Sequence, residues 1–391
     1  MNISAPTTGR NHTEDVHRHN LSVLLTAVHH SGGLPRARLT ELSGLNRSTT
    51  AALVSELVAT NLVIEAEVDS REGVGRPSRY VRPSVLPVAL AVNPEVDAMT
   101  LGIVGMGGHV FHRVRRKVAG EHTVDAAIAA AASMIRELDV SGHRVVGVGA
   151  AIPGQVRRSD GVVRLAPHLG WVDAPFARLL EDAVGLPVHA ANDASVGADA
   201  EGTFGAGRGI NDLVYLNGGA SGIGGGIISG RRPLGGSASY AGELGHTLVH
   251  SDGIVCHCGA TGCLETEVRR APLLKLVGLR DEESDQLGQA LLDSTSDAVH
   301  EEVSRQLGFL GITLRNAVNT LNPERIVLGG FLAALYAAAP EKLWQSRAAQ
   351  PLAASGESVS IVPAELGSDI LMVGAAELAF SGLLADPTTF A

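Results

Sequence analysis

Residues 256–265 read Cys256-His257-Cys258-Gly259-Ala260-Thr261-Gly262-Cys263-Leu264-Glu265, and they hold all three cysteines of this 391-residue chain. Thiolate and imidazole are the ligands that Zn²⁺ prefers, and three cysteines with one histidine complete a tetrahedron that leaves no position for a reacting water. A disulfide would leave the third cysteine unpaired. The run therefore predicts one structural zinc ion per chain, held by Cys256, Cys258, Cys263 and a histidine.

Two histidines can supply the fourth ligand. His246 lies ten residues before Cys256, and His257 lies inside the run. Gly259 and Gly262 fit a loop that wraps one ion, because glycine tolerates positive φ. The choice between the two histidines stays open on these residues alone.

Charge separates the chain into two parts. Its net charge is −10, yet residues 1–82 carry nine arginines against eight acidic residues, so the remainder holds the whole excess of negative charge. That acidic remainder is not expected to bind nucleic acid by itself. The sequence has no run of 18 apolar residues and its N-terminus is polar, so we expect a soluble cytoplasmic protein with no membrane partner.

Helical periodicity organises the first part of the chain. Residues 1–16 show none, and we expect a disordered tail there. Apolar residues recur at helical spacing over 17–30, a short helix over 35–43 ends before Gly44, and a third helix spans 47–60. Two short helices joined by a tight turn indicate a helix-turn-helix. We therefore predict a winged helix-turn-helix DNA-binding domain over 17–82.

The third helix of such a domain enters the major groove with its N-terminal residues. These are Arg47, Ser48, Thr49 and Thr50. A strand near 62–68 and a return strand would enclose a basic wing with Arg71, Arg76 and Arg79. The alternative is a small helical module for dimerisation with Arg47 merely solvated.

The rest of the chain alternates short apolar strands with helices, which indicates an α/β architecture. Strands are expected at 88–92, 99–104, 109–117, 145–150, 187–190 and 212–216, with helices at 124–138, near 173–184 and from Ala194. Glycines crowd residues 217–226, but no helix is expected to follow, which argues against a dinucleotide-binding loop. We expect two lobes around a cleft, with these glycines in a sharp turn beside it.

Four motifs together resemble the ROK family, which groups sugar-responsive repressors and sugar kinases on an actin-like, hexokinase-like fold. They are Glu243-Leu244-Gly245-His246, the Cys256–Glu265 run, Asn192-Asp193-Ala194 and the Gly222–Gly226 loop. The resemblance covers residues 83–391, which would form the sugar-binding and oligomerisation domain. The helix-turn-helix with Gly75-Arg76-Pro77 looks like the repressor branch of the family.

The resemblance implies roles for individual residues. It makes His246, rather than His257, the fourth zinc ligand. It also implies that a sugar lies in the cleft against Asn192, Asp193, Glu243 and Glu265, with His246 nearby. Taken singly, Asn192-Asp193 is typical of a helix cap and Glu265 of a solvated carboxylate at a helix start.

Two departures from the family pattern bear on activity. Kinases of the family carry an Asp-Xaa-Gly-Gly-Thr phosphate loop where this chain has Asn93-Pro94-Glu95-Val96-Asp97. Proline removes an amide donor, and Glu95 and Asp97 would repel phosphate, so we expect no enzyme activity and a ligand-contact role for Asp193. His168 stands where relatives commonly carry Asn, so the resemblance leaves open which sugar is accepted and whether His168 tunes the fit.

The sequence therefore predicts a homodimeric or homotetrameric repressor of carbohydrate-utilisation genes. It would bind operator DNA as an inverted repeat and a carbohydrate effector in the cleft. Two alternatives stay open, namely a ROK-type sugar kinase with an appended DNA-binding domain and a regulator that senses a protein partner.

Overall fold

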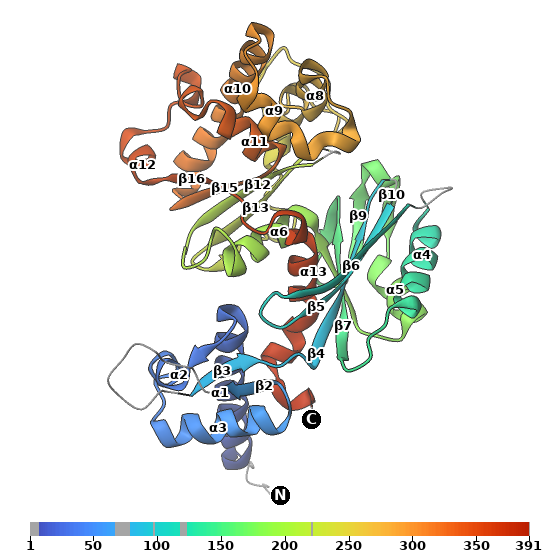
Figure 1. Ribbon diagram of the computed structural model, residues 1–391, viewed down its shortest axis with the longest axis vertical. Helices are drawn as coiled ribbons and strands as arrows, with labels where there is room; N and C mark the ends of the chain where they lie inside the picture. The colour runs from blue at the N-terminus through green and yellow to red at the C-terminus, as the bar shows by residue number, and fades with distance from the viewer. Residues whose placement is uncertain (1–7, 67–78, 97, 118–122, 220–221, 391) are drawn as a thin grey trace, which may run out of the picture.

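The computed structural model describes residues 8–66, 79–96, 98–117, 123–219 and 222–390 (Figure 1). An N-terminal domain is followed by two α/β lobes, and the N-terminal domain lies against the end of the C-terminal helix α13.

The N-terminal domain packs three helices against a small antiparallel sheet with strand order β1-β3-β2. Helix α2 ends at Gly44, which has a φ of 67°. Helix α3 begins after Asn46, whose side-chain oxygen accepts a hydrogen bond from the Thr49 amide at 2.9 Å. The elements are α1 (Thr8–Ser31), β1 (Leu34–Pro35), α2 (Arg36–Ser43), α3 (Arg47–Ala59), β2 (Val63–Ala66) and β3 (Tyr80–Pro83).

Helix α1 is longer than the sequence predicts. It begins at Thr8, whereas a disordered tail was expected up to residue 16. The buried residues Leu21, Leu24 and Leu25 fix the helix in the core. Once a helix is nucleated, each further residue adds one hydrogen bond at little cost, so a polar segment without periodicity can extend it. Residues 1–7 lie outside the described part of the chain.

The first lobe is built on a five-stranded sheet with order β11-β7-β4-β5-β6. Strands β4, β5 and β6 are antiparallel neighbours, whereas β7 and β11 run parallel to β4. A second, three-stranded sheet has the order β10-β9-β8. The elements are β4 (Pro87–Pro94), β5 (Ala98–Gly105), β6 (Val110–Lys117), α4 (Val124–Glu137), β7 (Arg144–Ile152), β8 (Gln155–Arg157), β9 (Val162–Ala166), η1 (Pro167–Leu169), β10 (Trp171–Ala174), α5 (Phe176–Val184) and β11 (Val188–Asn192).

The second lobe has a five-stranded sheet with order β14-β13-β12-β15-β16. Helices α8 to α11 gather around a core that includes Leu310, Leu314 and Leu328. The strands are β12 (Leu213–Gly218), β13 (Ile223–Ser229), β14 (Arg232–Pro233), β15 (Arg325–Gly330) and β16 (Ser360–Pro363). The helices are α7 (Leu264–Glu267), α8 (Arg270–Val277), α9 (Leu287–Asp293), α10 (Asp297–Leu321), α11 (Phe331–Ala338) and α12 (Ala353–Ser358), with short 3-10 turns η2 (Leu244–His246), η3 (Asp281–Gln286), η4 (Pro340–Lys342), η5 (Arg347–Ala349), η6 (Gly367–Asp369) and η7 (Pro387–Phe390).

The two large sheets share one design. In each sheet, three strands that are consecutive in the chain pair antiparallel, namely β4-β5-β6 and β12-β13-β14. Two later strands then extend the sheet in parallel next to the first of these, β7 and β11 beside β4, and β15 and β16 beside β12. The sequence shows no short-period repeat, because strand order depends on backbone pairing and leaves the side chains free to differ.

Each lobe contributes one helix to the other lobe. Helix α6 (Asp193–Phe204) follows β11 of the first lobe but packs against β12 and β13 of the second. Helix α13 (Ile370–Ala385) follows β16 of the second lobe but packs against β4 and β7 of the first. The two helices touch closely, since a Cβ on Gly374 would lie 2.2 Å from the carbonyl oxygen of Val196. They form the joint between the lobes (Figure 1).

Helix α13 is unusually apolar. The stretch Gly367–Ala385 has a mean hydropathy of 1.5, and of the described residues it alone is long and apolar enough to cross a membrane. However, 61% of it is buried within the protein. Its position between the sheet of the first lobe and α6 explains the apolar composition as that of a core helix.

Candidate functional site

The predicted metal ligands converge at the start of α7. His246 ends η2, Cys263 precedes α7, and Cys256 and Cys258 lie in the turn between them. Each of the four places one ligand atom within 4.8 Å of the others. The Sγ atoms of Cys258 and Cys263 are 3.7 Å apart, and Cys256 Sγ lies 3.6 Å from His246 Nδ1.

These separations agree with tetrahedral coordination. Zinc–sulfur bonds of about 2.3 Å and zinc–nitrogen bonds of about 2.0 Å place neighbouring ligand atoms about 3.5–3.8 Å apart. Burial raises the pKa values of Cys256 and Cys263, whereas the Ala260 amide lowers that of Cys258. A bound cation would keep all three sulfurs as thiolates, so the residues present fit a metal ion.

The geometry distinguishes the two histidines. His257 Nδ1 is 3.9 Å from Cys256 Sγ but only 3.1 Å from Glu265 Oε1. A second group with metal-binding spacing contains His246, Cys256, His257 and Glu265. The group that contains all three cysteines includes His246 and not His257. This favours His246 as the fourth ligand.

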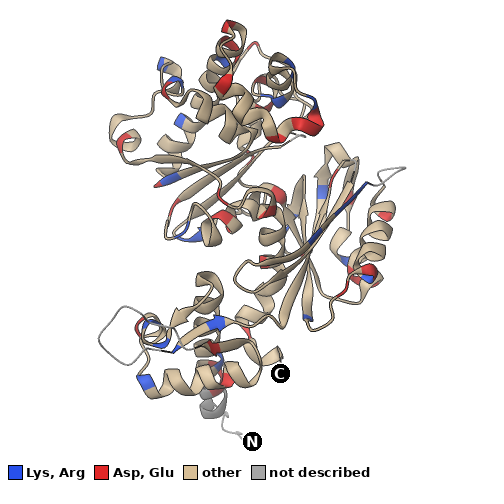
Figure 2. Ribbon diagram, viewed as in Figure 1, with Lys and Arg blue, Asp and Glu red and all other residues tan. Residues whose placement is uncertain are grey.

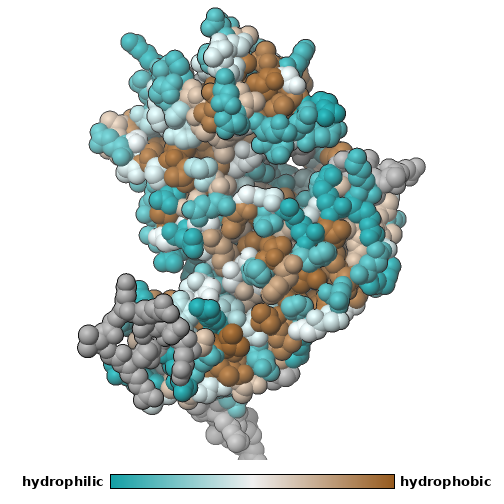
Figure 3. All heavy atoms as spheres, in the orientation of Figure 1, coloured by the Kyte–Doolittle hydropathy of each residue, from teal (hydrophilic) through white to brown (hydrophobic). Residues whose placement is uncertain are grey.

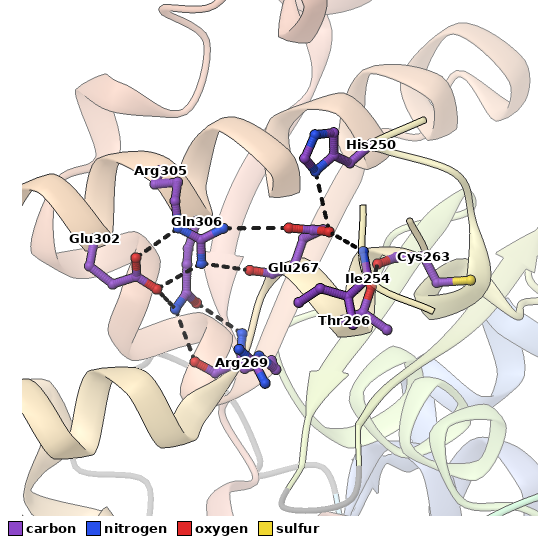
Figure 4. Close-up of polar contacts among 9 residues, drawn as sticks. All are labelled: His250, Ile254, Cys263, Thr266, Glu267, Arg269, Glu302, Arg305 and Gln306. Atoms are coloured by element: carbon purple, nitrogen blue, oxygen red, sulfur yellow. Dashed lines mark hydrogen bonds and ion pairs between the residues drawn. The ribbon is translucent and has the colours of Figure 1, made fainter. Parts of the chain in front are cut away.

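A buried carboxylate anchors the metal loop to helix α10 (Figure 4). Glu267 Oε1 accepts a hydrogen bond from the Ile254 amide at 3.1 Å and lies 3.3 Å from His250 Nδ1. Its Oε2 lies 3.6 Å from Arg305 Nη1, and Arg305 also donates to the Glu267 carbonyl oxygen at 2.9 Å. These contacts fix the segment that follows Glu265.

The cleft between the lobes gathers the side chains expected to bind the ligand, and the molecular surface is hollowed there (Figure 3). Both lobes contribute to it, as do the metal loop and η1. The lining residues are Pro153, Gly154, Pro167, His168, Asn192, Asp193, Ala194, Asn217, Gly219, Gly222, Ile223, Gly224, Glu243, His246, His257 and Glu265.

Asp193 is the first residue of α6 and faces this cleft. Its Oδ1 accepts a hydrogen bond from the Ala194 amide at 2.8 Å. Burial raises the pKa of Asp193 to about 6, and the charge of Glu243 adds to the shift. Burial also raises the pKa of Glu243. Hydroxyl groups of a ligand could donate hydrogen bonds to these carboxylates.

Asn192 has mainly a positioning role. Its side-chain oxygen accepts from the Ser195 amide at 2.9 Å and caps α6. Its Nδ2 donates to the Gly154 carbonyl oxygen at 3.0 Å and to Asp193 Oδ1 at 3.2 Å. Both amide hydrogens are therefore used within the protein, and Asn192 orients Asp193 and the start of α6.

Glu265 links the metal loop to the cleft. Its side chain is 8% exposed, and its Oε1 lies 3.1 Å from Cys256 Sγ and 3.5 Å from His246 Nδ1. Its other oxygen approaches Gly222, where a Cβ would lie 2.5 Å from Oε2. Gly222 also has a φ of 146°, so this close approach requires glycine. Glu265 is a buried carboxylate and not a solvated one.

His168 lies on the first-lobe side of the cleft, in η1. Its ring centre is 5.1 Å from that of His257, which in turn is 5.2 Å from that of His246. The three imidazole rings are in contact one after another, from η1 of the first lobe to the metal loop.

The described residues of the turn after β4 are held by polar contacts of their own. The Asn93 side chain donates to the Ala151 carbonyl oxygen at 2.9 Å. Glu95 accepts from Thr100 Oγ1 at 2.5 Å and pairs with Arg115 at 2.8 Å. Pro94 ends β4, and Asp97 lies outside the described residues. A carboxylate held in this turn would repel phosphate oxygens.

The start of α3 exposes only part of the predicted DNA-contact set. Arg47 and Ser48 are exposed, and Thr49 is half-buried. Thr50 is 1% exposed, and its hydroxyl donates to the Asn46 carbonyl oxygen at 3.1 Å. The prediction that Thr50 faces DNA is therefore wrong, because one further residue turns the side chain by about 100° into the core.

The predicted wing is described only at its base. Arg79 pairs with Glu65 at 3.2 Å, and Glu65 also pairs with Arg36. Arg71 and Arg76 lie outside the described residues. The N-terminal domain carries both basic and acidic residues (Figure 2).

Several residues that support the site gave no sequence signal. Glu267 reaches Arg305 across 38 positions, and Gln306 exchanges two hydrogen bonds with the Arg269 backbone across 37. An isolated Glu, Arg or Gln on a helix is typical of a solvated surface. Only knowledge of the packing of α10 on this loop could have identified them.

The fold and the cleft define the class of protein. The family model described as the ROK family matches residues 90–381, and this chain belongs to that family. The xylose repressor of Bacillus spizizenii is 26% identical over 369 residues, which cover 93% of this chain and 96% of that protein. The glucokinase of Streptomyces coelicolor is 29% identical, over 71% of this chain and 93% of the enzyme.

Solved structures show the same fold over most of the chain. A ROK family transcriptional regulator, a homologue of the E. coli Mlc protein, has a TM-score of 0.77, 24% identity and coverage of 95% of this chain and 97% of its own. A ROK glucokinase from Streptomyces griseus, in complex with glucose and AMPPNP, has a TM-score of 0.63 and 25% identity, and covers 75% of this chain and all of its own.

Proposed function

We propose that this protein is a sugar-responsive transcriptional repressor of carbohydrate-utilisation genes that acts in the cytoplasm. One observation carries the proposal. The same chain joins an exposed helix start in an N-terminal three-helix domain to a carboxylate-lined interlobe cleft. The likeness to xylose repressors over 93% of the chain supports it.

In this proposal α2 and α3 form the helix-turn-helix of a domain over 17–82. Arg47 and Ser48, with Thr49 beside them, would meet base edges and phosphates, because a capped helix N-terminus also attracts phosphate. Arg71, Arg76 and Arg79 would approach the DNA backbone from the wing. A two-fold homodimer, or a tetramer made of two, would bind an inverted repeat.

The effector is a carbohydrate. A sugar presents a ring of hydroxyls that donate and accept hydrogen bonds, and the cleft offers Asp193, Glu243, Glu265 and the imidazole of His246 to them. The relatives are named for xylose and glucose, so an aldopyranose is the first ligand class to test. His168 would contribute to the choice among such sugars.

A structural zinc ion would be held by His246, Cys256, Cys258 and Cys263. These four ligands would fill the tetrahedral coordination sphere of the ion and leave no open position. The bound ion would stiffen the loop that carries Glu265. Because His246 would use Nδ1 for the metal, its Nε2 would remain for the ligand.

The protein should not phosphorylate sugars. With D-glucose or D-xylose and Mg-ATP, we expect no sugar-dependent ADP release above background, because Glu95 occupies the turn where relatives hold phosphate. A coupled assay with a ROK glucokinase as positive control measures this. Turnover of about 1 per second or faster, within the usual enzyme range, would contradict the proposal.

Arg47→Ala should weaken operator binding by about 10- to 100-fold, because an arginine contact to a guanine edge contributes about 1–3 kcal/mol of discrimination. The measurement is a gel-shift titration on a DNA selected from a random pool, at fixed salt. Arg178→Ala is the matched control, since Arg178 is 67% exposed on α5 of the first lobe. Equal loss in both variants, or a selected site without an inverted repeat, would contradict the assignment of α3 as the recognition helix.

A further inference from the structure

Helix α6 connects the ligand cleft to the N-terminal domain. Its first residue, Asp193, lines the cleft. Its last residue, Phe204, packs edge-on against His29 of α1, with ring centres 5.4 Å apart, and against His30 at 6.1 Å. Twelve residues of α-helix span about 18 Å. A single rigid element therefore has one end at the ligand and the other at the DNA-binding unit.

His29 is held by the first lobe. It is fully buried, its Nδ1 accepts a hydrogen bond from the Gly107 amide at 2.9 Å, and its Nε2 lies 2.8 Å from Glu377 Oε1 on α13. Because Nδ1 accepts, the proton must be on Nε2, which donates to Glu377. The same assignment argues against a metal at His29, His30 and Glu377, since a protonated Nε2 has no lone pair to offer.

The contacts of α1 therefore differ on its two sides. Two hydrogen bonds, one accepted by His29 from the Gly107 amide and one from His29 to Glu377, tie α1 to the first lobe, and the buried Phe380 ring lies 5.3 Å from His29. The core of the N-terminal domain is also continuous with α13, through residues such as Leu25, Val28 and Leu383. By contrast, Phe204 meets the two histidines only through T-shaped ring contacts, and its ring also packs against Gly108 of the first lobe, where a Cβ would lie 3.1 Å from the ring. A ring contact tolerates small displacements more easily than the hydrogen-bonded contact of His29 with the first lobe.

Closure of the lobes would shift α6 relative to α13 and α1. Helix α6 packs beneath the sheet of the second lobe, and α13 packs beneath that of the first. A ligand bound between His168 on the first-lobe side and the Glu243–Glu265 side of the cleft would draw the lobes together. Closure of this kind moves packed helices past one another by small shear steps.

We infer that Phe204 transmits the occupancy of the cleft to the DNA-binding domain through its contact with His29 and His30. The inference rests on the proposed function and names its coupling residue. When the lobes close, the end of α6 shifts against α1, which stays bonded to Glu377 and Gly107. The N-terminal domain then changes its tilt, and in a dimer a small tilt moves one recognition helix out of register with its half-site.

The test measures coupling separately from binding. The full-length protein is titrated with D-xylose and D-glucose by calorimetry, and with operator DNA in the absence and presence of the saturating sugar. For wild type we expect the sugar to raise the operator Kd by at least about fivefold. In Phe204→Leu the operator Kd with sugar, divided by the operator Kd without sugar, should be near one. The sugar Kd and the sugar-free operator Kd should each change by less than about twofold. A defect in folding alone would change all three.

Further variants keep the test decisive. Phe204→Tyr retains the ring and should keep the coupling. His30→Ala removes a half-exposed partner of Phe204 and should reduce the ratio even if Phe204→Leu does not fold. Phe111→Leu, on β6 of the first lobe, is the matched control and should behave as wild type. Full coupling in Phe204→Leu overturns this inference alone, whereas a wild type that binds neither sugar overturns the proposed function and this inference with it.

Discussion

Asp193→Asn is expected to make the ligand-free protein more stable at pH 8 and to remove most of its sugar affinity. The folded protein holds the pKa of Asp193 at about 6, above the ordinary value of 3.8, mainly because the carboxyl is buried. A carboxyl with a raised pKa stabilises the fold when protonated, and this contribution disappears as the pH rises from about 4 to 6. Above pH 6 the buried charge destabilises the protein by at most roughly 3 kcal/mol.

The two effects have opposite signs, which makes the prediction specific. Asparagine carries no charge to bury, so the melting temperature of the variant should exceed that of wild type at pH 8, and the difference should shrink at pH 5. The same substitution removes a charged acceptor for a ligand hydroxyl, worth about 1.5–3 kcal/mol, so sugar affinity should fall about 10- to 100-fold.

Asp199→Asn is the matched control for affinity. Burial raises the pKa of Asp199 to about 6 as well, but this carboxyl pairs with Arg158 at 3.4 Å and does not line the cleft. We expect its sugar affinity to match that of wild type. Thermal unfolding at both pH values and calorimetry with D-xylose and D-glucose measure these quantities. An Asp193→Asn protein that binds sugar normally would place the ligand elsewhere.

Cys258→Ser should remove the metal and lower both stability and sugar affinity. Cys258 is exposed, so the substitution disturbs little packing and reports the contribution of the metal. Without the ion, the loop between His246 and Cys263 loses the bonds that bring its ends together, and Glu265 is no longer held against Gly222. Because metal binding is coupled to folding, we expect a fall of several degrees in melting temperature.

Elemental analysis of protein purified without chelators should give about one zinc per chain in wild type and much less in Cys258→Ser. His257→Gln is the control, and it should keep its zinc if His246 is the fourth ligand. Chelator treatment of wild type should reproduce the sugar-binding defect of Cys258→Ser. Wild-type protein without zinc, or a His257→Gln protein that loses it, would contradict the assigned ligand set.

The sequence alone determined the features that depend on residues close together in the chain. Cys256, Cys258 and Cys263 fall within eight positions, so their meeting around one metal needs only a local turn. Helices α2 and α3 lie where their apolar spacing, Gly44 and Asn46 indicate, because caps and periodicity act over one or two helical turns. The resemblance to the ROK family added Asp193, Glu243 and Glu265, which the structure brings into one cleft.

Tertiary structure decided which of these groups are free to act. Thr50 turned inward, and Asn192 uses its amide hydrogens within the protein. The exchange of α6 and α13 between the lobes, and the bond between His29 and Glu377 across 348 positions, have no local signature. A polar residue in an apolar helix carries no information about its partner until packing brings the two helices together, because burial and hydrogen bonding are properties of the assembled core.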